Sequence, residues 1–532
     1  MGRYIGIDLG TTFSVAAYVD DDGCARIIDN QEGENITASA VFFDNGTSIV
    51  GTDAKKESVI DSKHFVGFVK RQMGKSYVKY NIDGRDYKPE EISAIILSKL
   101  KKDVELALGE EVLGAVITVP AYFMDAQRQA TKDAARLAGL PVLDILNEPT
   151  AAALAYGISK NSDQKKKIMI YDLGGGTFDV SIMQFGGDKI EILSSMGDSE
   201  LGGYDFDKQI VEWFTNEVEK DGVSIGEDKD AGQELLMRAE EAKKSLSTGR
   251  SKVKISVSVQ GTRITKELTK EMFENMIGPI LYQTISLMEE AMDESGLQYE
   301  ELDKILLVGG STRIPLVASQ ITEETGIKPS QDIHPDEAVA IGAAYAAVEC
   351  AKNPQKKKTA QAETVTADAG RASGSAVDAE EHIPDLGKQY EFIDRTSHSI
   401  GIVVLNDDGE EENSIVLPRN TRIPAETHQD YQTVQDYQEQ LLIQVTQGEF
   451  TEIKNTTIVG DALLKLRPKP KGSPIRVVIS CDESSLIHVH VIDLEDNTNL
   501  GEMRIERSSN MSDEEIKEAQ QHLGKLNIGW ED

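Results

Sequence analysis

Two stretches of the chain share one pattern of apolar strand, glycine-containing turn and apolar strand. In residues 3–20, Ile5 and Ile7 alternate with their neighbours and the turn reads DLGTT. In residues 168–183 the turn reads DLGGGT. A period of two predicts strands, and a repeated unit indicates internal duplication. We therefore expect two similar α/β lobes. The alternative, chance similarity of two hairpins, is disfavoured by the shared Asp-Leu-Gly and the flanking strands.

Helical patterns lie between and beyond these hairpins. Apolar residues between 126 and 137 recur at helical spacing, and Asp125 can cap that helix. Pro149 stands in the first turn of a second helix, over the alanine-rich residues 150–155. Such small side chains allow a helix to pack closely on a sheet.

The pattern changes at about residue 351. The next 39 or so residues contain few large apolar side chains, which predicts a flexible linker. Farther on, runs such as 441–446 and 487–491 alternate again and are separated by turn residues, as in an antiparallel β-sandwich. Ser512 and Glu515 form a capping box that predicts one final short helix. The predicted parts are a two-lobed domain at 1–350, the linker at 351–389, the sandwich at 390–508 and the helix at 509–532.

Composition narrows the class of protein. The 532 residues exceed what one hydrophobic core usually organises, so at least two domains are expected. With 56 Lys and Arg against 91 Asp and Glu, the net charge is −35, which argues against nucleic-acid or membrane partners. The 3 cysteines are too few for a disulfide framework, and no apolar run is long enough to span a bilayer. We expect a cytoplasmic protein.

The glycine-rich turns are the first candidates for chemistry. Each Asp-Leu-Gly turn sets a carboxylate at a strand end beside backbone N–H groups that can cradle phosphate oxygens. The carboxylate can hold Mg²⁺, usually through water. DLGTT alone would fit an ordinary hairpin equally well, but two facing turns could clamp a nucleotide. A third glycine-rich segment at 307–313 also follows a strand, and none of these segments fits the P-loop pattern.

Ordered motifs then identify a resemblance. The chain resembles the seventy-kilodalton heat-shock (DnaK-type) chaperones, strongly over 1–350 and more weakly over 390–525. The resemblance implies an α/β fold with a two-lobed, actin-like (ribonuclease-H-like) ATPase domain followed by an antiparallel β-sandwich that holds extended peptides. The motifs that carry it are IGIDLGTTFS, VKR at 69–71, TVPAYFMDAQRQAT, NEPTAAALAYG, DLGGGTFDVS, LGGYDFD, LLVGGSTRIP and PDEAVAIGAA.

The resemblance assigns roles to matching residues. Asp8, Asp172 and Asp179 would organise Mg²⁺, its waters and nearby K⁺, with Asp172 also counted among the catalytic residues. Lys70 would orient the attacking water, Glu148 would couple that water to the domain switch, and the Thr177 hydroxyl would face the terminal phosphate. The further positions expected to bind ATP or ADP are Gly10, Thr11, Thr12, Phe13, Gly174, Gly175, Gly176, Gly202, Gly203, Glu240, Lys243, Lys244, Ser247, Gly309, Gly310, Ser311, Arg313 and Asp336.

Other positions concern the peptide and the path between the lobes. Pro120 and Arg128 match an interlobe relay. The residues expected at the peptide site are Leu405, Tyr431, Val434, Leu441 and Ile443. Ordinary sandwich core is the alternative for these apolar residues, and for Ile443 it is equally weighted.

The sequence also departs from the family. Because it ends after one helix, we expect the helical lid to be absent. Asp144 stands where relatives carry an arginine that J-domain co-chaperones contact, which makes that partner doubtful. Two short segments fall where nucleotide-exchange factors grip relatives.

The resulting hypothesis is an ATP-hydrolysing, stress-related chaperone that binds unfolded or extended peptides under nucleotide control. Its hydrolysis would be slow and stimulated by partners. One alternative is a non-refolding interaction scaffold on the same fold. A less favoured alternative is a sugar- or acetate-kinase-like phosphotransferase, for which the sequence offers no separate acceptor base.

Overall fold

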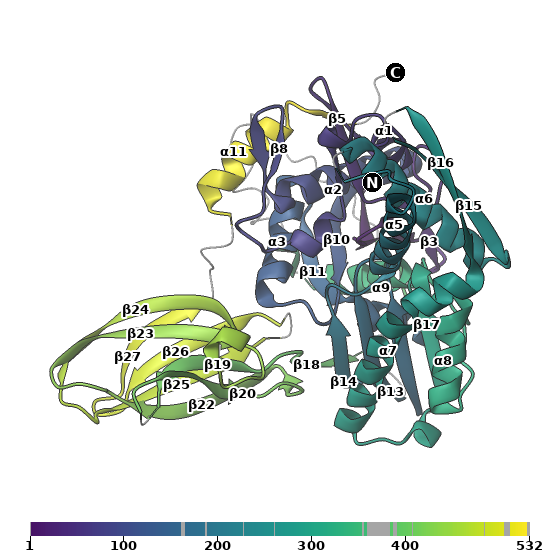
Figure 1. Ribbon diagram of the computed structural model, residues 1–532. Helices are drawn as coiled ribbons and strands as arrows, with labels where there is room; N and C mark the ends of the chain where they lie inside the picture. The colour runs from purple at the N-terminus through teal and green to yellow at the C-terminus, as the bar shows by residue number, and fades with distance from the viewer. Residues whose placement is uncertain are drawn as a thin grey trace.

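The computed structural model consists of an α/β domain with a β-sandwich at its side (Figure 1). The C-terminal helix α11 lies on the α/β domain, away from the sandwich. None of the described helices is long and apolar enough to cross a membrane. The residues that the structure describes are 2–160, 165–186, 189–226, 228–259, 261–353, 356–358, 383–386, 391–406, 408–482, 485–504 and 511–528. Most of the predicted linker, and residues 509–510 and 529–532, lie outside these ranges.

The first lobe is built on the hairpin predicted at residues 3–20. Strands β1 (Gly2–Asp8) and β2 (Phe13–Val19) are antiparallel. Strands β10 (Glu111–Val119) and β11 (Val142–Asn147) extend the sheet in parallel with β1, and β3 (Ala25–Ile27) follows β2. Asp8 ends β1, so the first Asp-Leu-Gly turn leaves the sheet at the carboxyl end of that strand.

The second lobe repeats this arrangement. Strands β12 (Lys166–Leu173) and β13 (Phe178–Gly186) form the hairpin, and β17 (Lys304–Val308) runs parallel to β12. Strand β14 (Lys189–Asp198) pairs with the far side of β13. The two hairpins therefore occupy equivalent places in their sheets, as the predicted duplication requires.

Helices fill the space around and between the sheets. Each lobe contains its own hydrophobic core. A third hydrophobic core joins residues of β1 and β12 to the small side chains of α4 and α9. A Cβ atom added to Gly342 would lie 1.8 Å from the Ala151 carbonyl oxygen, so these two helices need glycine where they meet. The helices are α1 (Thr52–Glu57), α2 (Pro89–Leu108), α3 (Asp125–Leu137), α4 (Glu148–Lys160), α5 (Gly203–Glu219), α6 (Lys229–Ser247), α7 (Lys270–Ser295), α8 (Pro315–Thr325), α9 (Ala338–Ala351) and α11 (Asp513–Leu523).

The predicted cap of α3 is wrong by one residue. Asp125 is the first helical residue, and Met124 occupies the N-cap position without a side-chain cap. The Gln127 side chain accepts the Met124 N–H at 3.0 Å, which satisfies a backbone donor there. The predicted capping box of α11 is confirmed, because Ser512 and Glu515 exchange hydrogen bonds.

Smaller elements complete each lobe. A four-stranded sheet in the order β28-β6-β5-β7 belongs to the first lobe, and the β15-β16 hairpin belongs to the second. These elements are β4 (Thr37–Ala38), β5 (Ala40–Asp44), β6 (Thr47–Val50), β7 (Phe65–Gly67), β8 (Tyr80–Ile82), β9 (Arg85–Tyr87), β15 (Lys252–Val259), β16 (Thr262–Thr269) and β28 (Asn527–Ile528). The 3-10 turns are η1 (Ser62–His64), η2 (Val69–Gln72), η3 (Tyr299–Glu301), η4 (Gly310–Arg313) and η5 (Ile453–Asn455).

The sandwich consists of two four-stranded antiparallel sheets around one apolar core, in the orders β20-β19-β23-β24 and β22-β25-β26-β27. Strand β18 pairs in parallel with β14 of the second lobe and antiparallel with β21. The sandwich is therefore joined to the α/β domain through a shared strand. Its strands are β18 (Glu391–Arg395), β19 (Ile400–Leu405), β20 (Glu411–Leu417), β21 (Arg422–Ile423), β22 (Ala425–Gln432), β23 (Gln438–Gln447), β24 (Thr457–Lys469), β25 (Pro474–Cys481), β26 (Ile487–Asp493) and β27 (Thr498–Arg504).

Candidate nucleotide-binding site

The two Asp-Leu-Gly turns face each other between the lobes. A Cβ atom added to Gly175 would lie 2.1 Å from the Thr12 hydroxyl oxygen, and one added to Gly176 would lie 2.3 Å from Thr11 Cγ2. Any side chain at either position would push the opposite turn away. The glycines therefore allow two loops rich in backbone N–H groups to approach each other, which is the arrangement that suits a chain of phosphates.

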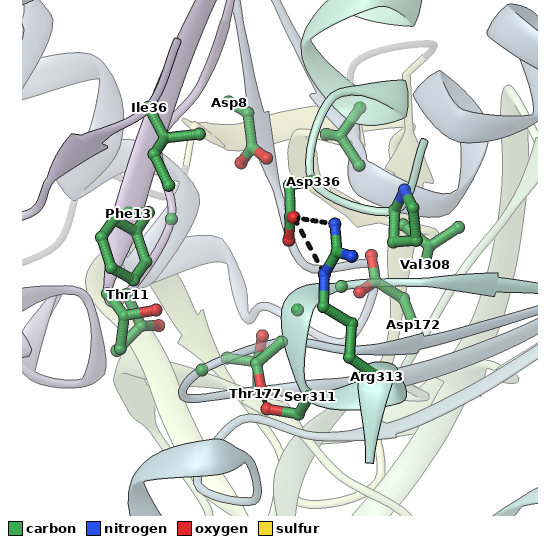
Figure 2. A pocket seen from close by; sticks show the side chains of 18 of the residues that line it. Asp8, Thr11, Phe13, Ile36, Asp172, Thr177, Val308, Ser311, Arg313 and Asp336 are labelled. Carbon is green, nitrogen blue, oxygen red and sulfur yellow. Dashed lines mark hydrogen bonds and ion pairs between the residues drawn. The ribbon is translucent and has the colours of Figure 1, made fainter. Parts of the chain in front are cut away.

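A cavity of about 250 Å³ opens between these turns. Figure 2 shows side chains of both lobes around it, with Asp8, Thr11 and Phe13 from the first lobe and Thr177 and Ser311 from the second. The predicted residues that line it are Asp8, Gly10, Thr11, Thr12, Phe13, Lys70, Glu148, Asp172, Gly174, Gly175, Thr177, Lys243, Lys244, Ser247, Gly309, Gly310, Ser311, Arg313 and Asp336. Apolar walls that the sequence reasoning missed come from Ile36, Val308, Pro335 and Val339.

Two carboxylates that line the cavity, Asp8 and Asp172, lie near a third, Asp179, which is buried and does not line it. Loss of surrounding water and the nearby charge of Glu148 raise the pKa of Asp8 to about 7. Burial and the neighbouring carboxylates raise the pKa of Asp172 and of Asp179 well above the usual range. Such mutual repulsion favours a bound cation. Among the described residues, no three His, Cys, Asp or Glu side chains are grouped to ligate a metal directly. Coordination of a metal through water stays a prediction.

Lys70 and Glu148 form a buried ion pair beside these carboxylates. Lys70 lies on η2 and Glu148 opens α4, so two separate elements of the first lobe meet here. Lys70 Nζ lies 2.5 Å from Glu148 Oε1, and the residues are only 5% and 7% exposed. The lysine charge opposes the repulsion among the carboxylates, because it lowers the pKa of Asp8, Asp172 and Asp179. This places one ammonium group beside the buried carboxylates of the cleft.

The third glycine-rich segment lies against the second turn. Ser311 Oγ donates to the Gly174 carbonyl at 2.8 Å. Gly309 has a φ of +82°, and a Cβ atom there would lie 2.4 Å from the Leu173 carbonyl oxygen. Arg313 donates to Asp336 from Nη2 at 2.5 Å and from Nε at 3.2 Å, as the dashed lines in Figure 2 show.

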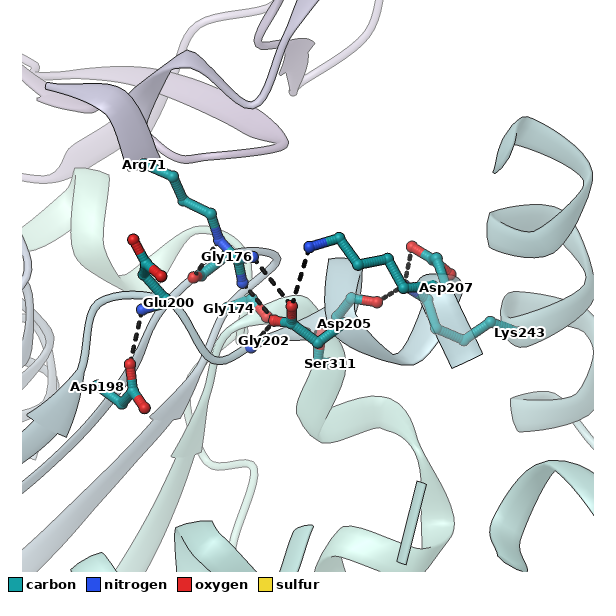
Figure 3. A network of polar contacts seen from close by, with 12 residues as sticks. Arg71, Gly174, Gly176, Asp198, Glu200, Gly202, Asp205, Asp207, Lys243 and Ser311 are labelled. Carbon is teal, nitrogen blue, oxygen red and sulfur yellow. Dashed lines mark hydrogen bonds and ion pairs between the residues drawn. The ribbon is translucent and has the colours of Figure 1, made fainter. Parts of the chain in front are cut away.

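Gly202 and Gly203 support the second turn without lining the cavity. The Gly203 N–H donates to the Gly174 carbonyl at 3.0 Å. Arg71, which the sequence reasoning did not single out, donates to the Gly176 carbonyl at 2.8 Å and pairs with Asp205 (Figure 3). Arg71 thereby ties η2 of the first lobe to the second Asp-Leu-Gly turn. In the sequence, Arg71 could have been singled out by its position next to Lys70 in the VKR motif.

An ion pair links the two lobes at the outer end of the cleft. Glu240 does not line the main cavity but borders a second one that adjoins it at Phe13 and Lys244. Burial would raise the pKa of Glu240, but Lys55 and Lys244 hold it at about 2. The Lys55–Glu240 pair, at 2.8 Å, joins the first lobe to α6 of the second. The Lys244 ammonium lies 4.9 Å from the centre of the Phe13 ring.

A hydrogen-bonded path connects the cleft to the sandwich. The Arg128 guanidinium donates to Asn147 Oδ1 at 2.6 Å and to the carbonyls of Ala121 and Phe123. Asn147 Nδ2 in turn donates to Asp394 Oδ2 of β18 at 2.8 Å. Asn147 directly precedes Glu148, so the path reaches the ion pair of the site. Pro120, the other predicted relay residue, is buried at the end of β10, where its carbonyl accepts the Phe123 N–H.

The predicted peptide residues differ in exposure. Leu405 and Val434 are half exposed, whereas Tyr431 and Leu441 are partly buried against the sandwich core. Tyr431 Oη lies 2.9 Å from Ser414 Oγ. Ile443 is 3% exposed and belongs to the core itself, which is the alternative that the sequence left open for it.

Comparison with known proteins is consistent with this geometry. The sequence model of the family described as "Hsp70 protein" matches residues 4–358 and 349–527. The chain is 39% identical over 500 residues to "Chaperone protein DnaK" of Thermotoga neapolitana, covering 92% of this chain and 78% of that protein. It is 40% identical over 502 residues to the protein of the same name from Thermosipho africanus, with the same coverage. The chain belongs to the Hsp70 family.

Proposed function

We propose that this protein is an ATP-dependent chaperone of the DnaK type, in which nucleotide bound between the lobes controls the affinity of the sandwich for unfolded or extended peptides. The observation that carries the proposal is the continuity between the two sites. Strand β18 completes the sheet of the second lobe and also pairs with β21 of the sandwich. A change in how the lobes close would therefore shift the sandwich between docked and released positions.

In this proposal the two glycine turns hold the phosphates of ATP, and Mg²⁺ held through water by Asp8, Asp172 and Asp179 neutralises phosphate charge. K⁺ is a further candidate for the same carboxylate region. Lys70 orients the attacking water and stabilises the charge that develops on the transferred group. The Thr177 hydroxyl faces the terminal phosphate, and Glu148 accepts a hydrogen bond from Lys70 and adjoins Asn147. Slow hydrolysis is expected until a partner changes the lobe closure.

Leu405, Tyr431, Val434 and Leu441 are the proposed contacts for peptide side chains, supported by their partial exposure. A nucleotide-exchange factor is a further candidate partner. A J-domain co-chaperone is doubtful, because Asp144 replaces the expected positive charge and is already paired with Lys356 at 2.5 Å. A role in the stress response and a cytoplasmic location complete the proposal.

The alternatives have less support. A phosphotransferase would need an acceptor pocket with its own base, and the described cavity holds no such base beyond the carboxylates and lysine assigned above. A scaffold would not need the buried Lys70–Glu148 pair in contact with the path to β18.

Peptide release tests the proposal directly. A fluorescent unfolded peptide is bound to the protein, and its dissociation rate is measured with ADP and with ATP. We expect faster release with ATP, and loss of specific binding in Leu441→Asp. Leu463→Asp is the matched control, because Leu463 is exposed on the outer face of β24. Equal release rates in both nucleotides, with binding unaffected by Leu441→Asp, would refute the proposal.

A further inference from the structure

The short turn η2, which carries Lys70, begins at a residue with an unusual backbone conformation. Phe68 occupies the N-cap position of η2 with a φ of +58° and a ψ of +24°, in the left-handed region. Bulky residues rarely adopt this conformation, so surrounding contacts must hold it. Because Phe68 lies between the end of β7 and η2, its position sets the direction in which the chain continues to Lys70, two residues later.

The Phe68 ring packs on Tyr204, which belongs to the second lobe. The two ring centres are 4.0 Å apart, and the ring planes are inclined by 30°. Tyr204 lies in the first turn of α5, and its ring centre is also 5.2 Å from the Arg71 guanidinium carbon and 4.3 Å from the Lys208 ammonium. Cations at such distances are attracted to an aromatic ring. Tyr204 therefore contacts residues on both sides of Lys70 in the VKR turn.

The backbone of Tyr204 supports the second Asp-Leu-Gly turn. Its N–H donates to the Gly175 carbonyl at 2.8 Å. Arg71 Nη1 donates to the neighbouring Asp205 at 3.0 Å, and Arg71 Nε donates to the Gly176 carbonyl, as Figure 3 shows. A movement of this turn therefore moves the ring on which Phe68 packs.

The aromatic pair lies outside the cavities. Neither Phe68 nor Tyr204 is among the described residues that line the nucleotide cavity or the cavity beside it, so the proposed chemistry leaves the pair without a role. Lys70 itself is held at its ammonium group by Glu148 of the first lobe. Its backbone is held through Phe68 by the second lobe, so the place of Lys70 depends on both lobes.

We propose that Phe68 and Tyr204 are positioning residues for ATP hydrolysis, whose contact brings Lys70 to its working position when the lobes close. This inference rests on the proposed role of Lys70 in catalysis. Phosphates held by the second turn draw Tyr204 toward the first lobe, the two rings pack, and η2 takes its fixed position. With the lobes apart, Phe68 loses its partner and the backbone of Lys70 can move. Hydrolysis is thereby confined to the closed cleft.

The consequence is specific to the chemical step. Loss of either ring leaves the glycine turns and the bond from Arg71 to Gly176 in place, so the contacts proposed to hold ATP remain. Lys70 becomes less precisely placed, and a displacement of about 1 Å can lower the rate of a reaction by as much as 10²-fold. The rate of hydrolysis should therefore fall more than the affinity for nucleotide.

Single-turnover hydrolysis of bound ATP by the full chain measures this step. Tyr204→Ala and Phe68→Ala should each slow it about tenfold, with affinity for ATP changed less than about threefold. Tyr204→Phe keeps the ring and should retain most of the wild-type rate. The matched control is Tyr282→Ala, which removes an exposed tyrosine of α7 in the same lobe and should match the wild type. An unchanged rate in Tyr204→Ala, with or without a loss of nucleotide affinity, would overturn the proposal.

The double variant Phe68→Ala with Tyr204→Ala decides whether the two rings act as one contact. If they do, the double variant is about as slow as either single variant, whereas multiplied effects would refute the proposal. The wild type and Lys70→Ala report on the proposed function itself. A wild type without hydrolysis refutes that function, whereas a normal wild-type rate that Tyr204→Ala retains refutes only this inference.

Hydrogen exchange provides a readout that does not depend on activity. The Arg71 N–H donates to the Phe68 carbonyl at 3.2 Å within η2. With Mg²⁺ and a non-hydrolysable ATP analogue, this amide should exchange more slowly in the wild type and in Tyr204→Phe, but not in Tyr204→Ala. Thermal melting identifies any variant that does not fold, and Phe68→Asn, which tolerates a positive φ, then replaces Phe68→Ala. Equal protection of the Arg71 amide in the wild type and a folded Tyr204→Ala protein would contradict the proposal.

Discussion

Replacing Lys70 by alanine should abolish hydrolysis while sparing nucleotide binding. The Lys70 ammonium lies 2.5 Å from Glu148 and among carboxylates whose pKa values its charge lowers. Its proposed value to the reaction is the stabilisation of charge that appears only in the transition state. Removing one preorganised group of that kind costs about 3–4 kcal/mol, which is roughly 10²–10³ in kcat. Affinity for nucleotide should change by no more than a few fold, because the backbone turns and the adenosine end are untouched.

The variant also breaks a buried ion pair. Leaving Glu148 unpaired among Asp8, Asp172 and Asp179 costs about 3–5 kcal/mol of stability in protein without a bound cation. Mg²⁺ should restore much of this loss, so the measurements are made with Mg²⁺ present. The matched control is Lys75→Ala, which removes only the half-exposed pair with Glu200 and should cost about 1 kcal/mol or less.

The assay for Lys70→Ala has two parts. Single-turnover hydrolysis reports the chemical step, and titration with a fluorescent ATP analogue reports binding. Turnover should fall by at least about 10² in Lys70→Ala, with near-normal binding, and should show no comparable loss in Lys75→Ala. A collapse of nucleotide affinity with substantial residual turnover would show that Lys70 binds ATP in the ground state instead.

Three further predictions follow from other contacts. Stability of the wild type should fall as pH rises from about 4.5 to 7, by about 3 kcal/mol from Glu90, because burial raises its pKa from 4.5 to about 7 and favours the protonated folded form. Urea unfolding should show this slope reduced in Glu90→Gln. Arg71→Ala, which frees the Gly176 carbonyl, should weaken ATP binding in calorimetry, whereas Lys79→Ala, which removes an exposed lysine that lines neither cavity, should not. Asp144→Arg should increase stimulation of hydrolysis by an added J-domain protein, and strong stimulation of the unmodified protein would contradict the reasoning.

The parts of the site that are formed by consecutive residues could be predicted from the sequence. Both Asp-Leu-Gly turns could be recognised because a carboxylate at a strand end and adjacent glycines are consecutive residues. Their facing arrangement followed from the repeated hairpin, and the structure shows why Gly175 and Gly176 must be glycines. The strands of the sandwich were predictable from period-two alternation for the same local reason.

Contacts between distant elements could not be read from pattern alone. The pairing of Arg71 with Asp205 depends on how the lobes close, and docking of α11 on α3 joins residues nearly 400 positions apart. The capping box at Ser512 and Glu515 predicted the final helix but not the surface on which it packs. Ile443 shows the same limit, because an inward-facing residue of a sandwich strand can line a pocket or fill the core, and only the packing decides.

The central claim is that the nucleotide and peptide sites are coupled through the Arg128–Asn147–Asp394 path. The most direct measurement is the ATP hydrolysis rate with and without saturating unfolded peptide, in the wild type and in Asn147→Ala, which removes the bridge between Arg128 and Asp394. The account predicts that peptide raises the wild-type rate, and that Asn147→Ala binds both ligands but responds little to peptide. A wild-type rate that peptide leaves unchanged, or equal stimulation of Asn147→Ala, would contradict it.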